Sequence, residues 1–335
     1  MVNPVLVELT RGPLVESRHR GAVAVSDAKG RLQLGIGDVD DPIFPRSALK
    51  PIQAVPLIES GAADAYRLSD EELALAAASH SGEKMHTERV ARWLTRIRCS
   101  VSDLACGPQR PSHEPTANAM IASGERWTPI HNNCSGKHTG FLTLARGLGA
   151  SVADYQTVDH PTQRAVEATL SDMAGLSRPL PWGVDGCTVP NFAVPLSALA
   201  RAIAQFADPS ELSPSRAEAC GRIVKAMAAN PDLVAGSGRT CTALMRQAEG
   251  IAVKTGAEGV YVAALPRLGL GVALKIDDGA PRASETAVAA LLIALKALPD
   301  EGAAALIARA PVLNTRGVRV GERRATAVLT QPAWA

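Results

Sequence analysis

The chain has 335 residues, of which 46% are hydrophobic, 20% charged and 3% aromatic, and its formal net charge is +2. A chain of this length and composition can bury a large core, as one globular domain or two. The near-neutral charge excludes a broad basic surface for nucleic acid, and the shortage of aromatic side chains argues against a stacking platform for bases or a carbohydrate cleft.

The sequence carries no signal for export or membrane insertion. The N-terminus lacks a basic segment followed by an apolar run, so we expect no secretory signal. The longest apolar run, residues 287–295, ends at Lys296 and is shorter than the about 18 residues that a membrane span needs. Six cysteines in a chain of this size do not predict a disulfide framework. We therefore expect a cytoplasmic protein.

The apolar pattern predicts strands at both ends of the chain and helices between them. Alternating or β-branched runs predict strands at residues 5–9, 14–25, 32–36, 259–264, 269–276 and 318–328. Helical spacing with end signals predicts helices at residues 52–60, 69–77, 87–97, 137–148, 162–174, 196–206, 216–229, 239–248 and 284–298. Ser69 with Glu72 is typical of a capping box, and Ser284 is expected to cap the last of these helices. Residues 107–131, rich in Pro, Ser and Asn, are expected to be mostly loop.

This order predicts the fold class. Strands that cluster at the two ends of a chain pack most economically as one mainly antiparallel sheet, with helices over its faces. We therefore predict an α+β fold in a single domain, 1–335. The sheet would come from about residues 1–45 and 255–335, and residues of about 46–250 would form a helical lobe.

The first chemical signal is a serine three residues before a lysine, Ser47 and Lys50, bracketed by Pro45 and Pro51. Because Pro51 cannot donate a backbone hydrogen bond, a helix here must have its first turn at about residues 48–51, which places Ser47 at or near the N-cap. Positions i and i+3 share one helix face. A lysine held there out of water has a lowered pKa and can take the proton of the serine.

The same Ser-x-x-Lys spacing recurs at Ser26 and Ser81, so the motif by itself could be coincidence. Context favours Ser47, because Ser26 lies in a polar turn and Ser81 in the opening of a loop, whereas Ser47 stands between an extended stretch and an apolar helix. Lys254 begins a Lys-Thr-Gly that leads into a strand. In serine acyl-transferases with a Ser-x-x-Lys base, a Lys-Thr-Gly lines the opposite wall of the site.

Two polar stretches in the middle of the chain could belong to the same pocket. Residues 79–83 place hydroxyls and an imidazole on a tight turn, which is either a second serine of the pocket or a solvated helix end. Cys134 and Cys187 lie in Gly-rich polar turns, and two thiolates with one nitrogen could hold zinc. The spacing matches no common zinc finger. Lys137 and His138 are the nitrogen candidates, of which His138 is the more ordinary ligand.

Four stretches together closely resemble the rhizobial-type, or class 3, L-asparaginases of the asparaginase II family, namely residues 44–51, 78–83, 132–138 and 185–187. The resemblance runs from the first strand to near the end of the chain. It implies a fold like that of the serine β-lactamases and glutaminases, hydrolysis of L-asparagine to L-aspartate and ammonia, and a homodimer.

The resemblance also implies roles for individual residues. It implies two Ser–Lys pairs, Ser47 with Lys50 and Ser79 with Lys254, although Lys275 on the next strand competes for the last position. It implies a zinc ion close to the substrate, with the ligands Cys134, Lys137 and Cys187, which favours Lys137 over His138. Neighbourhood alone predicts the residues that bind the substrate, Arg46, His80 and Asp185.

Two other functions stay open at this point. The first is an acyl-serine enzyme that interacts with β-lactams, although the usual Ser-x-Asn element of such enzymes is replaced by Ser79-His80-Ser81. The second is a non-catalytic metal-binding protein. Release of ammonia from asparagine and glutamine, measured beside a penicillin reporter, would separate all three.

Overall fold

The computed structural model describes residues 2–332; Met1 and residues 333–335, which the predicted domain includes, lie outside them. The chain divides into two compact units. Unit 1 comprises Met1–Ala48, Val194–Glu211 and Ala243–Ala335, and unit 2 comprises Leu49–Ala193 and Leu212–Thr242. Within the described part of the chain, every helix is too short or too polar to cross a bilayer. That the whole chain behaves as one domain stays a prediction.

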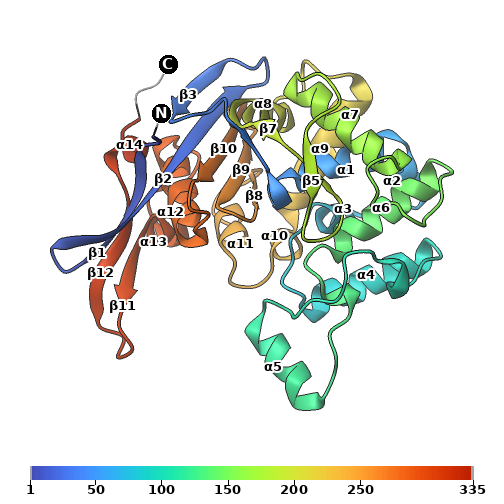
Figure 1. Ribbon diagram of the computed structural model, residues 1–335, viewed down its shortest axis with the longest axis horizontal. Helices are drawn as coiled ribbons and strands as arrows, with labels where there is room; N and C mark the ends of the chain where they lie inside the picture. The colour runs from blue at the N-terminus through green and yellow to red at the C-terminus, as the bar shows by residue number, and fades with distance from the viewer. Residues whose placement is uncertain (1, 333–335) are drawn as a thin grey trace. The chain divides into compact units, whose positions relative to one another are not determined.

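Unit 1 is built on an antiparallel sheet to which both ends of the chain contribute (Figure 1). Its eight described strands are β1 (Val5–Arg11), β2 (Leu14–Asp27), β3 (Leu32–Ile36), β8 (Ala252–Thr255), β9 (Val260–Leu265), β10 (Leu270–Ile276), β11 (Arg309–Leu313) and β12 (Arg319–Ala325). The strand order is β11-β12-β1-β2-β10-β9-β8, and β3 pairs with β2. The predicted α+β fold, with a sheet from the two chain ends, is confirmed.

Strand β2 joins the two halves of this sheet. Its first half pairs with β1, where Ser17 faces Leu9, and its second half pairs with β3 and β10, where Val25 faces Leu34 and Val272. Helices α8 (Leu196–Ala207) and α12 (Pro281–Ala294) pack on the sheet. At Gly271 a Cβ atom would lie 2.1 Å from the backbone nitrogen of Ala204, so only glycine allows α8 to approach β10 this closely.

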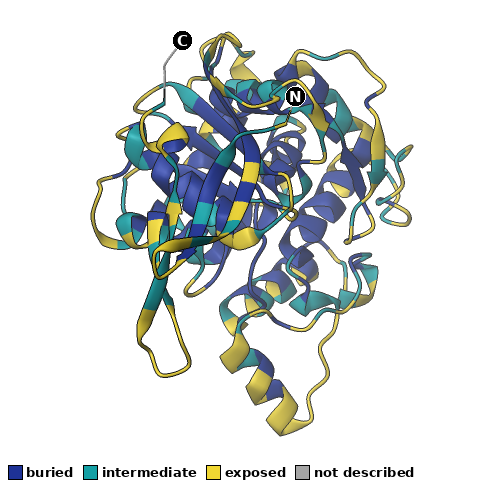
Figure 2. Cartoon of the chain, turned by 60° about the vertical axis from the view of Figure 1, so that its left-hand side comes forward, coloured by how far each residue is buried: buried dark blue, intermediate teal, exposed yellow. Residues whose placement is uncertain are grey.

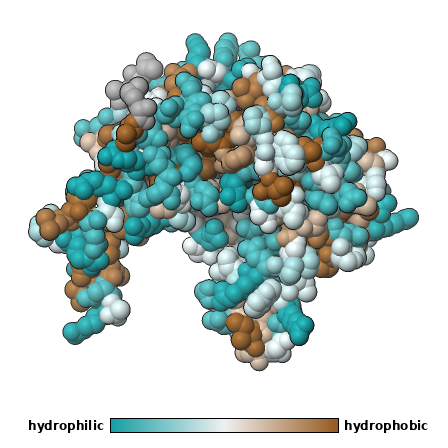
Figure 3. Space-filling view, in the orientation of Figure 1, coloured by the Kyte–Doolittle hydropathy of each residue, from teal (hydrophilic) through white to brown (hydrophobic). Residues whose placement is uncertain are grey.

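The C-terminal part of unit 1 differs from the prediction. The predicted helix 284–298 begins earlier, at Pro281, and the Ser284 hydroxyl donates to the Pro281 carbonyl instead of capping the helix. A further helix, α13 (Gly302–Ala308), and strand β11 were not predicted, and the strand expected at 318–328 is the shorter β12. The face drawn in Figure 3 is mostly hydrophilic with scattered apolar side chains, and Leu313, at the end of β11, is 55% exposed.

Unit 2 is helical and is packed around one buried helix. Its helices are α1 (Lys50–Glu59), α2 (Ala62–Ala65), α3 (Asp70–Ala76), α4 (Lys84–Arg96), α5 (Glu114–Ser123), α6 (Ser135–Gly147), α7 (Pro161–Ala174), α9 (Pro214–Ala229) and α10 (Pro231–Val234). Every residue of α1 from Lys50 to Ile58 is buried, because α2, α3, α6, α7 and α9 all pack against it. A helix enclosed in this way needs apolar residues all round. Only Lys50 and Gln53 break that rule among the buried positions.

Short elements complete the fold. Strands β5 (Trp182–Val184) and β6 (Pro190–Phe192) form a small hairpin in unit 2. In unit 1, β4 (Pro42–Ile43) pairs with β7 (Val194–Pro195). Helix α11 (Thr240–Met245) lies across the division of the chain into units, and it is shorter than the helix predicted at 239–248.

Local signals decide which helices of unit 2 were predictable. The capping box at the start of α3 is confirmed, since Glu72 N donates to Ser69 Oγ and Ser69 N donates to Glu72 Oε2. Helix α5 was not predicted, because it lies inside the expected loop 107–131. It buries only Ala117 and Met120, so its sequence carries no apolar stripe, and Figure 2 shows most of its surface exposed.

Candidate active site

In unit 1, Ser47 lies on a strained turn that leads into α1. The turn is the 3₁₀ helix η1 (Arg46–Leu49), and the N-cap of α1 is Leu49, so Ser47 precedes the cap by two residues. Arg46 has φ +53°, a left-handed conformation that costs energy for a residue with a side chain and is often retained at functional sites. The Ser47 side chain is half-buried, and within unit 1 its hydroxyl makes no hydrogen bond to the described residues.

The Lys-Thr-Gly motif lies against this turn. A Cβ atom at Gly256 would lie 2.5 Å from the Pro45 carbonyl oxygen and 3.2 Å from the Ala48 nitrogen, so the glycine is required by the close approach of two backbones. Lys254, two residues earlier on β8, is buried, and its amine donates to the Thr255 carbonyl at 2.7 Å. Unit 1 therefore brings together the Ser47 turn and the strand end that carries Lys254.

The competing lysine is held differently. Lys275 is half-buried on β10, and its amine donates to the carbonyls of Glu258 (2.8 Å) and Ile276 (2.5 Å). Burial lowers the pKa of Lys275. Its backbone carbonyl faces Gly21 of β2, and its strand pairs with β9. Among its described hydrogen bonds none reaches the Ser47 turn.

In unit 2, Lys50 is the centre of a buried polar cluster. The residue is 1% exposed, and its amine contacts the Ala78 carbonyl at 2.5 Å, Ser79 Oγ at 2.9 Å and Cys134 Sγ at 3.1 Å. The structure thus joins the lysine of the first motif to the serine of the second. The predicted pairs Ser47–Lys50 and Ser79–Lys254 each have one member in each unit, and both stay predictions.

The loop that carries Ser79 is fixed from several sides. Ser79 N donates to the Val234 carbonyl at 2.9 Å, and His80 N donates to the Asn133 carbonyl at 3.2 Å. At the end of the loop, the buried Glu83 carboxylate accepts hydrogen bonds from Ser81 Oγ (2.6 Å) and from the nitrogen and hydroxyl of Ser237 (both 2.8 Å). Neither Glu83 nor Ser237 was singled out from the sequence, because nothing local shows that they meet.

His80 is enclosed within this loop. Its Nε2 lies 2.9 Å from Ser135 Oγ, its Nδ1 accepts from Gly82 N, and its ring stacks on His86 with 4.8 Å between centroids. Burial, with smaller contributions from His86 and Lys50, lowers the pKa of His80 well below the ordinary value, so the ring is neutral. A role for His80 in binding substrate stays a prediction.

Two thiols and an amine meet beside Lys50. Lys137 Nζ donates to Cys187 Sγ at 2.9 Å, and Lys50 Nζ donates to Cys134 Sγ at 3.1 Å. The neighbouring Cys187 thiol, followed by the positive charges of Lys50 and Lys137, lowers the pKa of the Cys134 thiol well below its ordinary value against the opposing effect of burial. The neighbouring Cys134 thiol and burial raise the pKa of Cys187. Burial opposes the charged form of Lys137, but the two sulfurs outweigh it and raise its pKa.

The structure separates the two nitrogen candidates for a metal. The Nδ1 atom of His138 lies 2.6 Å from the Tyr155 hydroxyl, and no described hydrogen bond of its side chain reaches a thiol. Burial, then the charges of Lys137 and Lys50, lower the pKa of His138 well below its ordinary value. Lys137 is therefore the nitrogen that meets the thiols. Asp185, also a predicted site residue, lies at the edge of this group, with Oδ2 3.7 Å from Cys187 Sγ.

These donors form an unusual but coherent set for a metal. Within residues 2–332, no three or more His, Cys, Asp or Glu side chains are grouped so that they could hold a metal ion. A set of two cysteine sulfurs and a lysine nitrogen, of which the nitrogen contacts Cys187, falls outside that class of site. Thiolates are ligands that zinc prefers, and a thiol whose pKa is already lowered exchanges its proton for a metal readily. The residues present therefore fit zinc by their chemistry.

Comparison with known proteins gives one match over most of the chain. The profile of a family described as L-asparaginase II matches residues 7–325. Among curated proteins, none matches the chain.

Similar solved structures are more distant. They include Mglu in its native form (15% identity, TM-score 0.44, covering 77% of this chain and 56% of that chain) and a β-lactamase, Mb2281c, from Mycobacterium bovis (12%, TM-score 0.44, 79% and 89%). A third is the simvastatin synthase LovD of Aspergillus terreus (11%, TM-score 0.38, 77% and 86%). The chain thus spans little more than half the length of Mglu. At these identities and TM-scores the likeness bears on neither substrate nor mechanism.

Proposed function

The chain belongs to the L-asparaginase II family and is an amidohydrolase; from this premise we propose that it converts L-asparagine to L-aspartate and ammonia through an acyl-serine intermediate. The observation that supports this mechanism most is the buried contact between Lys50 Nζ and Ser79 Oγ, at 2.9 Å. A buried amine in contact with a hydroxyl is an arrangement through which a proton can pass between lysine and serine, as the proposed relay requires.

We assign the nucleophile to Ser47 and a relay role to Ser79. Ser47 is half-buried on a strained turn, whereas Ser79 is 5% exposed and hydrogen-bonded to Lys50. Lys50 follows Ser47 by three residues in the continuous η1–α1 segment. In the proposed reaction Lys50 takes the Ser47 proton, and Ser79 passes protons between Lys50 and the second lysine, which we take to be Lys254.

The proposed reaction has two stages, acylation of Ser47 and hydrolysis of the resulting ester. The Ser47 oxygen bonds to the carbon of the side-chain amide, the C–N bond breaks, and the nitrogen leaves as ammonia after it receives the proton held by Lys50. Water then gives a proton to Lys50 and its oxygen to the ester carbon. Aspartate is released, and the Ser47 oxygen recovers its proton from Lys50.

Among the predicted substrate ligands, Arg46 suits the α-carboxylate and Asp185 the α-ammonium. The neutral His80 offers no charge for either group.

We propose a zinc ion for the cluster of Cys134, Lys137 and Cys187. When bound, zinc would supply positive charge that orients the substrate beside the serines. Lys137 would have to release the proton that the sulfurs now favour, so metal binding would release protons and weaken at acidic pH.

Ammonia release tests the proposed function directly. Purified protein should release ammonia from L-asparagine, and Ser47→Ala should abolish that release while the fold persists. L-glutamine and a chromogenic penicillin, assayed in parallel, separate the substrate preference and the β-lactam alternative. Turnover of the penicillin without ammonia release would favour the β-lactam enzyme, and zinc binding without either activity would favour the non-catalytic alternative.

A further inference from the structure

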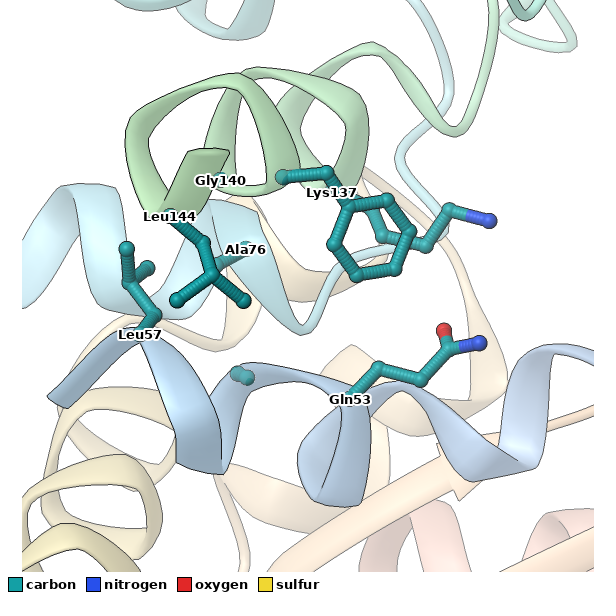
Figure 4. Close-up of a pocket in the computed structure, with 8 residues that line it drawn as sticks. Gln53, Leu57, Ala76, Lys137, Gly140 and Leu144 are labelled. Atoms are coloured by element: carbon teal, nitrogen blue, oxygen red, sulfur yellow. The ribbon is translucent and has the colours of Figure 1, made fainter. Parts of the chain in front are cut away.

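A cleft in unit 1 takes no part in the proposed mechanism. It has a volume of about 590 Å³ and is lined by residues 247–249, Arg267, Ile293 and residues 296–300, all of which belong to unit 1. In unit 2, by contrast, side chains of α1, α3 and α6 close a space of about 200 Å³ that has no room for a water molecule (Figure 4). The cleft of unit 1, unlike that narrow space, has the size of a small-molecule site.

The cleft lies between segments that are tied together within unit 1. Gln247 joins the segment before β8 to the start of α13, because its Nε2 donates to the Glu301 carbonyl at 3.0 Å and its Oε1 accepts from Ala304 N. Helix α12 ends beside the cleft, where Ala297 N donates to the Leu292 carbonyl at 2.9 Å. The cleft is therefore part of the folded unit and needs no ligand to form.

The cleft combines apolar surface with charged groups. Its apolar lining residues Leu298 and Ile293 are buried and half-buried, respectively, whereas Glu249, Arg267 and Lys296 are exposed. The charged side chains thus keep access to water and to a solute. Apolar walls with a few charged groups bind a small ligand whose own charges are carried on a short apolar body.

Three of the charged side chains have no partner in the protein. Those of Glu249, Arg267 and Lys296 make no hydrogen bond or ion pair with any residue from 2 to 332. Asp300, which also lines the cleft, differs because its Oδ1 accepts from Arg309 Nη2 at 2.5 Å. One unpaired charge on a protein surface is ordinary. Two cations and one carboxylate without partners around the same cleft are free to bind a solute of the opposite charge pattern.

We propose that this cleft binds L-aspartate, the product of the proposed reaction, and other amino acids with a second carboxylate. The inference rests on the proposed function only for the origin of the ligand. An α-amino dicarboxylate carries two carboxylates and one ammonium, which is the charge complement of Arg267, Lys296 and Glu249. The planar guanidinium of Arg267 binds one carboxylate through two parallel hydrogen bonds, and Lys296 holds the other as a point charge.

The same charge pattern distinguishes the product from the substrate. L-asparagine has one carboxylate fewer than L-aspartate, so it leaves one of the two cations unpaired. Its Kd for the cleft should be about 3- to 10-fold higher than that of L-aspartate. Because each exposed ion pair contributes little, the Kd of L-aspartate should be about millimolar and should rise with salt.

Hydrogen exchange followed by mass spectrometry locates the ligand, which matters because L-aspartate is also expected in the active site. L-aspartate at about 10 mM should slow exchange in peptides that cover residues 247–252 and 293–301. A titration of this protection gives the Kd for the cleft alone. L-asparagine, succinate and L-glutamate are titrated in the same way.

Lys296→Asn removes one cation without new backbone strain. Lys296 directly follows the C-cap of α12 and has φ +57°, a left-handed conformation that Asn tolerates. Arg98→Asn is the matched control, because the exposed Arg98 follows the C-cap of α4 in unit 2 with φ +54°. Lys296→Asn should raise the Kd of L-aspartate by about 3- to 10-fold, and Arg98→Asn should leave it unchanged.

Glu249→Gln tests the contact with the ammonium. It should weaken binding of L-aspartate but not of succinate, which has two carboxylates and no ammonium. Thermal unfolding is measured for each variant, so that a loss of binding is not confused with a loss of fold.

Protection of both peptides that favours L-aspartate over L-asparagine, and that weakens in Lys296→Asn but not in Arg98→Asn, supports the inference. No protection of these peptides, equal Kd values for the two amino acids, or equal effects of the two variants would overturn it and leave the proposed function intact. If the peptides are protected but the wild type releases no ammonia from L-asparagine, the proposed function falls and the cleft remains a site for amino dicarboxylates.

Discussion

Replacement of Lys50 is the perturbation whose effects follow most directly from the structure. Lys50→Met removes a buried amine that makes three contacts, to Ala78 O, Ser79 Oγ and Cys134 Sγ. If Lys50 is the general base, kcat for ammonia release should fall by about 10²- to 10⁴-fold. Three lost hydrogen bonds would cost about 3 kcal/mol in unfolding free energy. Burial of the wholly apolar methionine side chain, which is one heavy atom shorter than lysine, returns about 1 kcal/mol, so the variant should fold with a loss of about 2 kcal/mol.

Two further variants separate proton transfer from charge. Lys50→Arg keeps a positive charge but cannot be deprotonated in a protein, so it should be as inactive as Lys50→Met. Lys225→Met is the control, because Lys225 is exposed on α9 and pairs only loosely with Asp70, at 3.8 Å. The assays are steady-state ammonia release and denaturant unfolding. A folded Lys50→Met or Lys50→Arg that keeps more than about a tenth of wild-type kcat would refute the role of Lys50 as the base.

Other predictions concern the Ser47 turn, the Ser79 loop and the metal cluster. Gly256→Ala should place a Cβ against the Pro45 carbonyl and lower kcat while destabilising the fold by about 1–3 kcal/mol; wild-type kinetics in this variant would contradict the packing described. Burial raises the pKa of Glu83, but hydrogen bonds from Ser81 and Ser237 outweigh it and lower the pKa. The stability that Glu83 contributes is therefore present above its unfolded pKa of about 4.3 and lost as pH falls through the lower folded value. In Glu83→Gln the unfolding free energy should fall less between about pH 6 and pH 3 than in the wild type, and equal slopes would contradict the assignment. Cys187→Ala should bind less zinc by elemental analysis than the wild type at equal protein concentration, and unchanged zinc content would remove Cys187 from the ligand set.

Local chemistry made part of the fold predictable. The capping box of α3 needs only Ser69 and Glu72, three residues apart, and the alternation of strands β1 to β3 is visible within each strand. The division of β2 between two partners could not be predicted, because it depends on where strands from the other end of the chain arrive. Helix α5 was missed because an exposed helix needs no apolar stripe.

The candidate site shows the same limit of local reasoning. Lys137 and His138 lie three and four residues after Cys134, so both positions lie near it on a helix and spacing cannot choose between them. The choice depends on Tyr155, which the fold brings to His138 from another segment.

The most direct measurement is the identity of the acylated serine. The protein is quenched in acid during turnover of an L-asparagine analogue whose acyl-enzyme hydrolyses slowly, and the adduct is located by peptide mass spectrometry. The proposed mechanism predicts an aspartyl adduct on Ser47 that disappears in Ser47→Ala. An adduct on Ser79, or rapid ammonia release from Ser47→Ala, would contradict it.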